Sequence, residues 1–95
     1  MDSEKSNRNE IQEAFIEKMV KNLPVLRASV RLSQRQLAEK IGITRQSMVS
    51  IETHKRPLSW SLYLALVLVF YHFEDSKKLM ENYELFDEEV IRNVM

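Results

Sequence analysis

The chain of 95 residues contains a single glycine, Gly42, and only two prolines. Sheets joined by tight turns need such residues at their turns, so this scarcity leaves few turn signals for a β structure. The rest of the chain is rich in helix formers such as Leu, Glu, Lys, Arg and Met. We therefore expect an all-α fold, and the length is that of one domain with its own core.

Charge is unevenly distributed along the chain, although the formal net charge is zero. Residues 21–58 carry eight Lys and Arg against two Glu, a net of +6. By the same count residues 1–20 carry a net of −2 and residues 59–95 a net of −4. A basic segment between acidic flanks is typical of a protein that binds a polyanion.

The chain contains no cysteine, which excludes disulfide bonds and thiolate metal sites. Its first ten residues, MDSEKSNRNE, are polar and charged, and no apolar signal segment follows them. The apolar run at residues 60–71 is too short to span a bilayer, which needs about 20 residues. We therefore expect a cytoplasmic protein without a membrane-spanning segment.

Caps and breakers divide the chain into successive helices. We expect a disordered tail at residues 1–10 and then a helix that ends at about Leu23. Pro24 favours the first turn of a separate helix over residues 24–31, although it can also kink one longer helix. The further expected helices run from the Ser33 cap to Ile41, from the Thr44 cap to about Thr53, from the Ser59 cap to about Tyr71, from Asp75 or Ser76 to Leu85, and from the Asp87 cap to the C-terminus.

The segment LAEKIGITRQSMVSIE, residues 37–52, has the spacing of a helix-turn-helix. Ala38 is small where the two helices cross, and Gly42 supplies the positive φ that the turn needs. The other helices are expected to end at proline or polar caps with looser geometry. Five apolar residues are expected to form the core beneath both helices: Leu37, Ile41, Ile43, Met48 and Ile51.

With these positions filled, the chain resembles the lambda-repressor-like, Xre-type helix-turn-helix family over about residues 23–71. The resemblance implies a compact five-helix DNA-binding bundle, here with extra N- and C-terminal helical segments, that binds duplex DNA as a two-fold dimer. It also implies a buried pair between Arg27 and Glu52. The chain departs from the family at His54, where Gly or Asn is common, and at residues 30–31, where a glycine is absent. Outside the main motif, the resemblance is carried by Leu26-Arg27 and Leu32-Ser33-Gln34.

Residues 44–53 form the expected recognition helix. A helical projection places Met48 and Ile51 toward the core and a polar face opposite. Arg45 can pair with guanine and Gln46 with adenine in the major groove. Val49 suits a thymine methyl group, and Ser50 can contact either type of base. The expected base-reading residues are therefore Arg45, Gln46, Val49 and Ser50.

A second set of residues is expected to contact phosphate. Gln34 begins a helix, where backbone N–H groups and the helix dipole favour an anion, and the resemblance implies a phosphate-contacting glutamine there. Thr44 serves first as a cap. The full expected set is Gln34, Arg35, Thr44, Ser47, Thr53, Lys55 and Arg56. Neutralising four to six phosphates predicts a log–log salt slope of about −4 to −5 per domain.

The helix at residues 60–71 is apolar on nearly every side, so all of its sides require cover. A five-helix domain at residues 11–74 covers one side. The rest is expected to meet the C-terminal segment at residues 75–95 or a second copy, and residues 10–22 are an alternative cover. We expect a homodimer through residues 59–95.

No catalytic arrangement is visible in the sequence. His54 and His72 are the only histidines, and they are isolated from one another. The sequence shows neither a Ser-His-acid constellation nor a phosphate-cradling glycine loop. We expect no enzymatic activity, no metal site and no cofactor.

Three functions remain open from the sequence. The first is a DNA-binding transcriptional regulator, most simply a repressor, that binds a palindromic operator as a dimer. The second is an antitoxin that represses its own operon while its C-terminal region neutralises a toxin partner. The third is a protein-interaction module that keeps the fold without binding DNA. The basic segment around Arg45 and Gln46 counts against the third.

Overall fold

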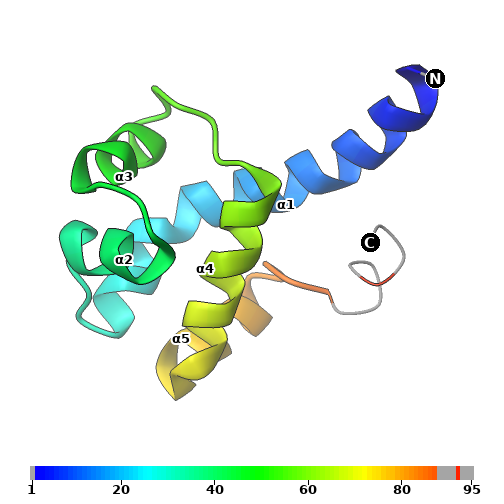
Figure 1. Cartoon of the computed structure of the whole chain (residues 1–95). Helices are drawn as coiled ribbons and strands as arrows, with labels where there is room; N and C mark the ends of the chain where they lie inside the picture. The colour runs from blue at the N-terminus through cyan, green and yellow to red at the C-terminus, as the bar shows by residue number, and fades with distance from the viewer. Residues whose placement is uncertain (1, 88–91, 93–95) are drawn as a thin grey trace.

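The computed structural model describes the backbone of residues 2–87 and 92, and the side chains of residues 10–87 and 92. All the regular structure in this part of the chain is helical, which confirms the all-α prediction (Figure 1). None of the described helices combines the length and the apolar character needed to cross a bilayer. The five helices are α1 (Asp2–Ser29), α2 (Gln34–Ile41), α3 (Arg45–Glu52), α4 (Trp60–His72) and α5 (Glu74–Asn82).

The beginnings of α2, α3 and α4 are fixed by the side chains that the sequence indicated. The Ser33 hydroxyl accepts from the Gln36 N–H at 3.0 Å, and the Gln36 side chain accepts from the Ser33 N–H at 2.9 Å. This reciprocal capping box stabilises the first turn of α2. Thr44 caps α3 and Ser59 caps α4 in the simpler one-bond form.

The turn between α2 and α3 depends on the single glycine. Gly42 has φ of 78° in the left-handed region, and the Ile43 N–H donates to the Ala38 carbonyl at 3.0 Å. This closes the last turn of α2 and redirects the chain into α3. Ala38 is buried at the crossing, as predicted. Of the five apolar motif residues, Leu37, Met48 and Ile51 are buried in the core, whereas Ile41 and Ile43 are half-buried against it.

Helix α1 differs from its prediction, because one continuous helix passes through Pro24. The prediction of a helix end at Leu23 and a new helix at Pro24 is wrong. Met19, Leu23 and Leu26 are all fully buried at helical spacing, so one apolar stripe continues across the proline. Pro24 itself is exposed. The helical backbone also includes residues 2–10, where a disordered tail was expected, and no glycine or proline interrupts that stretch.

Helix α5 begins earlier and ends earlier than predicted. It starts at Glu74 without a side-chain cap. Ser76, expected as a possible cap, is buried and donates to the Phe70 carbonyl at 2.6 Å. The helix ends before Glu84, whose φ of 53° is left-handed, and does not reach Leu85. The further helix expected from Asp87 lies outside the described residues.

One core joins all five helices. Helix α1 packs against α3, α4 and α5, and α2 packs against both α3 and α4. Met80 of α5 and the following Leu85 are fully buried in this core, so the described part of residues 75–95 shares the core of residues 11–74. Tyr63 of α4 donates to the Leu85 carbonyl at 2.5 Å, which ties the end of the described chain to the centre of the molecule.

Candidate nucleic-acid interface

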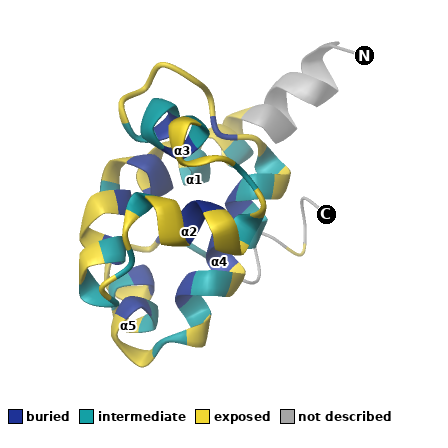
Figure 2. Ribbon diagram, turned by 60° about the vertical axis from the view of Figure 1, so that its left-hand side comes forward, coloured by how far each residue is buried: buried dark blue, intermediate teal, exposed yellow. Residues whose placement is uncertain are grey.

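Helix α3 presents the surface that the sequence singled out. Met48 and Ile51 are buried beneath it, as the helical projection predicted. Arg45 and Gln46 are exposed, as is most of the loop that follows α3 (Figure 2). Val49 and the side chain of Ser50 are only half-exposed.

Two of the four predicted base-reading side chains have their polar groups unengaged. Within the described part of the chain, Arg45 and Gln46 form no side-chain hydrogen bond or ion pair. A guanidinium and an amide in this state can each offer a bidentate edge to a base. The first turn of α3 is therefore chemically suited to direct readout of guanine and adenine.

A bidentate ion pair fixes the far end of α3. Arg27 of α1 donates from Nε to Glu52 Oε2 at 2.7 Å and from Nη2 to Glu52 Oε1 at 2.9 Å. The side chains are 18% and 6% exposed, so the pair is largely removed from water. Arg27 also donates to the Leu32 carbonyl at 3.2 Å. The pair implied by the family resemblance is thus present, and it holds α3 to α1 and to the α1–α2 connection.

Gln34 takes part in the same cluster. Its Nε2 donates to Glu52 Oε1 at 3.1 Å, and its side chain is half-buried. The sequence predicted only a phosphate contact for this glutamine. The structure adds a second role, because the bond aligns the start of α2 with the end of α3. One N–H of the amide remains beyond this bond for an anion.

The N-terminal end of α3 is held by a different network. Arg56, from the loop after α3, donates from Nη1 to Ser47 Oγ at 2.7 Å. Thr44 and Ser47 hydrogen-bond to each other through their hydroxyls at 3.0 Å. Three of the predicted phosphate-contacting residues therefore lie together at one end of α3. A phosphate at this position would meet a guanidinium and backbone N–H groups at once.

The contact between Arg56 and Ser47 of α3 was not predicted from the sequence. The Ser50 carbonyl accepts from the N–H groups of Lys55 at 2.8 Å and Arg56 at 3.2 Å, so the loop folds back on the helix. This folding follows from the left-handed conformation of His54, whose φ is 63°. The available signal was the position of His54, where the family that the sequence resembles commonly has Gly or Asn, two residues that adopt positive φ readily.

The remaining predicted phosphate contacts are less uniform. Thr53 donates its hydroxyl hydrogen to the Val49 carbonyl at 2.8 Å. A phosphate oxygen needs a donor, so Thr53 is poorly arranged for that contact in this conformation. Arg35 and Lys55 are exposed, and neither side chain is engaged with another described residue. These two cations remain suited to phosphate.

The described residues contain no group of three or more His, Cys, Asp or Glu that could hold a metal ion. The polar groups gathered at α3 lie on a helix whose two ends are hydrogen-bonded to other parts of the chain, through Glu52 at one end and Ser47 at the other. Comparison with protein-family models, with curated proteins and with solved structures gives no match for the chain.

Proposed function

We propose that this protein is a sequence-specific DNA-binding transcriptional regulator that places α3 in the major groove. The main support for the proposal is that Arg45 and Gln46 are exposed and form no side-chain hydrogen bond within the described chain. They lie on a helix whose ends are hydrogen-bonded to Arg27 at Glu52 and to Arg56 at Ser47. Rigid presentation of a few base-reading side chains is what direct readout requires. The basic character of residues 21–58 supports attraction to the DNA backbone.

The two networks have distinct roles in this proposal. The Arg27–Glu52 pair sets the direction of α3, and the Arg56–Ser47 bond sets the position of its first turn. Arg45 and Gln46 then read bases, while Arg35 and Lys55 contact phosphates on either side. Phosphate contacts fix the register of the helix on the duplex, and base contacts provide the specificity.

Selection of binding sites from a random duplex pool, followed by affinity measurement on the selected site, tests the proposal. Gln46→Ala and Arg45→Ala are each expected to weaken binding by about 1–3 kcal/mol and to relax specificity at one base pair. Lys78→Ala on α5 removes a charge far along the chain from α3 and serves as the control for Arg45→Ala. Equal affinities of both α3 variants and the wild type would refute the assignment of these base-reading residues.

We further propose that the protein acts as a homodimer through residues 59–95. Leu68 of α4 is 76% exposed, the most exposed of the large apolar side chains in the described chain. Leu64 and Ala65, one turn before it, are half-buried. A dimer across this side of α4 would cover Leu68 and would present two copies of α3 to half-sites about 34 Å apart.

A folded chain that binds no duplex DNA, random or selected, even at low salt would favour the interaction-module alternative. A DNA-binding monomer would instead leave the Leu68 side of α4 open to a different protein, which is compatible with the antitoxin alternative.

A further inference from the structure

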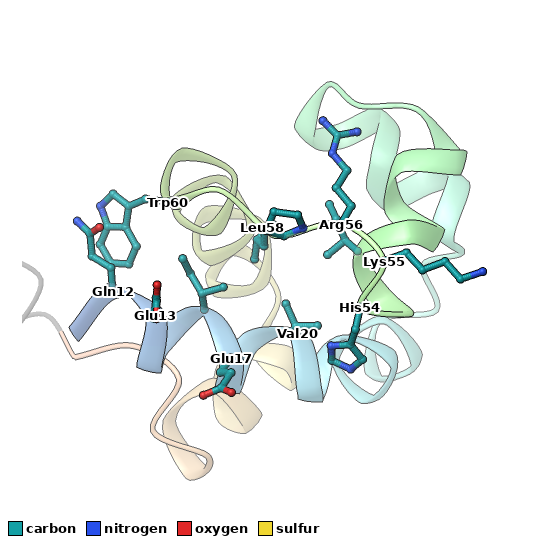
Figure 3. Close-up of a pocket in the computed structure, with 12 residues that line it drawn as sticks. Gln12, Glu13, Glu17, Val20, His54, Lys55, Arg56, Leu58 and Trp60 are labelled. Atoms are coloured by element: carbon teal, nitrogen blue, oxygen red, sulfur yellow. The ribbon is translucent and has the colours of Figure 1, made fainter. Parts of the chain in front are cut away.

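A groove of about 640 Å³ lies between α1 and the loop that joins α3 to α4 (Figure 3). Its volume is within the range of sites that hold small organic ligands, about 300–1,000 Å³. Apolar side chains from separate elements line it: Ile16 and Val20 from α1, Ile51 from α3, and Leu58 from the loop. This groove is a different surface from the exposed face of α3, because Ile51 lies on the buried side of that helix.

Charged side chains line the groove from both walls, with two carboxylates on α1 and two cations, Lys55 and Arg56, on the loop. Glu13 and Glu17 line it one helical turn apart, which makes them neighbours on the helix surface. Both are exposed, and neither forms an ion pair or hydrogen bond with another described side chain. Two adjacent carboxylates without a cation favour the binding of a positively charged group.

The cations on the opposite wall do not neutralise these carboxylates. Lys55 and Arg56 line the groove with their stems, and Figure 3 shows both side chains extending away from α1. Arg56 ends on Ser47 of α3, at 2.7 Å. The charged ends of this wall are thus directed outward. On the α1 wall, Glu13 lies nearer to Trp60, whereas the Glu17 carboxylate is directed away from Trp60 and marks the rim of the groove (Figure 3).

An aromatic side chain completes the groove. Trp60, at the start of α4, lies at one end beside Gln12 of α1 (Figure 3). Its indole stacks on the Tyr63 ring, with centroids 4.8 Å apart and planes within 12°. This stacking fixes the orientation of a half-exposed indole. Tryptophan attracts cations over its ring face more strongly than other aromatic residues do.

We propose that this groove binds an organic cation that has an apolar body, such as a quaternary ammonium or phosphonium compound. The apolar body would occupy the space over Ile16, Val20 and Leu58. The cationic centre would lie between the Glu13 carboxylate and the Trp60 ring, with the Glu17 carboxylate adding negative charge at the rim of the groove. The proposal does not depend on DNA binding, because the side chains assigned to the cation lie outside the expected base-reading and phosphate-contacting sets; only Lys55 and Arg56, on the other wall of the groove, belong to the latter set.

The only tryptophan of the chain is Trp60, so its fluorescence reports on the groove directly. Titration of the full chain with tetraphenylphosphonium is expected to quench this emission saturably. Tetraphenylborate has nearly the same shape and the opposite charge, and it is expected to bind at least about tenfold more weakly. Saturable quenching by both ions with equal affinity would overturn the proposal, as would the absence of quenching by the phosphonium.

Variants locate the site of the cation. Glu13→Gln combined with Glu17→Gln is expected to weaken phosphonium binding about five- to tenfold, since each screened ion pair contributes modestly. Glu39→Gln on α2 removes one exposed carboxylate outside the groove and is expected to leave binding unchanged. An affinity unaffected by the double substitution, in a variant with wild-type circular dichroism, would show that the cation binds elsewhere.

Discussion

At the scale of single residues, four of the five described helices, α1, α2, α3 and α5, end in a shared left-handed conformation. Four residues have positive φ within the described chain, and only Gly42 among them is a glycine. The others are Arg31 at 58°, His54 at 63° and Glu84 at 53°. After each of the four, the next N–H donates to a carbonyl five residues earlier, at 2.8–3.0 Å. The expectation of looser helix ends is therefore wrong for α1, α3 and α5, whereas α4 ends at Phe73 in an extended conformation, with φ of −104°.

This conformation predicts a stabilising substitution at Glu84. A residue with a Cβ destabilises the folded state by about 1–2 kcal/mol when its backbone is in the left-handed region, whereas glycine does not. Glu84→Gly is expected to raise the free energy of unfolding by about 0.5–1 kcal/mol, after the entropy gained by the unfolded chain is subtracted. Lys78→Gly, at an exposed position inside α5, is the control and should lower the free energy of unfolding by about 1 kcal/mol. Urea unfolding measures both, and a loss of stability in Glu84→Gly would contradict the argument.

The opposite substitution is informative at Gly42. A Cβ added there meets no atom within 4 Å, so any cost comes from the backbone alone. Gly42→Ala is expected to lower the free energy of unfolding by about 1–2 kcal/mol. Gly42→Asn should lower the free energy of unfolding less than Gly42→Ala does, because Asn adopts positive φ more readily than Ala. Equal losses in thermal or urea unfolding would indicate that side-chain packing, not φ, limits this position.

Tyr63 predicts a dependence on alkaline pH. Burial raises the pKa of its phenol far above the ordinary value, and Tyr71 raises it further. The unfolded chain ionises this phenol near pH 10, so the stability contributed by the protonated group is complete below about pH 10 and falls as the pH rises above it. At neutral pH, Tyr63→Phe should lower the free energy of unfolding by about 1 kcal/mol, because the hydrogen bond to the Leu85 carbonyl is lost. Above pH 10, the free energy of unfolding of this variant should fall less steeply with pH than that of the wild type. The exposed Tyr83→Phe serves as control in urea unfolding at several pH values; parallel curves for Tyr63→Phe and wild type would contradict this reading.

At the scale of elements, sequence reasoning succeeded where one residue type fixes one local geometry. Ser33, Thr44 and Ser59 begin helices as predicted because their hydroxyls satisfy amides of the first turn. It failed at Pro24, because the packing of buried residues on both sides outweighs the local preference of proline. It also failed at Ser76, because the buried Ser76 hydroxyl donates a hydrogen bond to the Phe70 carbonyl instead of capping α5.

In the candidate site, too, the features set by local sequence were predictable and those set by tertiary folding were not. Exposure of Arg45 and Gln46 follows from helical periodicity and was predictable. The contact between Arg56 and Ser47 was not, because it depends on how the loop at residues 53–59 folds back on α3. The exposed side of α4 was predictable only as a side that needs cover, and within the described chain Leu68 on this side remains exposed.

The link between α1 and α3 predicts strong coupling in a double-mutant cycle. Removing one member of the largely buried Arg27–Glu52 pair leaves the other charge without its partner. Arg27→Met and Glu52→Leu are each expected to cost about 3 kcal/mol. The double variant should cost clearly less than the sum, because it leaves no uncompensated charge. Additive losses in urea unfolding would show that the two side chains act independently.

At the scale of the whole molecule, α4 occupies the centre, and Leu68 on its outer side is open to solvent. If a second copy covers this side, Leu68→Glu should convert the protein to a monomer, because a carboxylate would be placed in the apolar interface. Val25→Glu on α1 changes another exposed apolar residue and should leave the assembly intact. Sedimentation equilibrium measures both variants. A wild-type protein that remains monomeric at every concentration would contradict the dimer.

The left-handed helix ends also bear on how this chain can change over evolutionary time. Arginine and glutamate codons are each one nucleotide away from a glycine codon, so Arg31 and Glu84 are positions where a point mutation can add stability. A lineage that acquires such a mutation gains tolerance for destabilising substitutions elsewhere. The exposed face of α3 could then diversify without unfolding the domain. Arg31 and Glu84 are thus positions at which a single mutation to glycine could add stability and so increase the number of other substitutions that the fold tolerates.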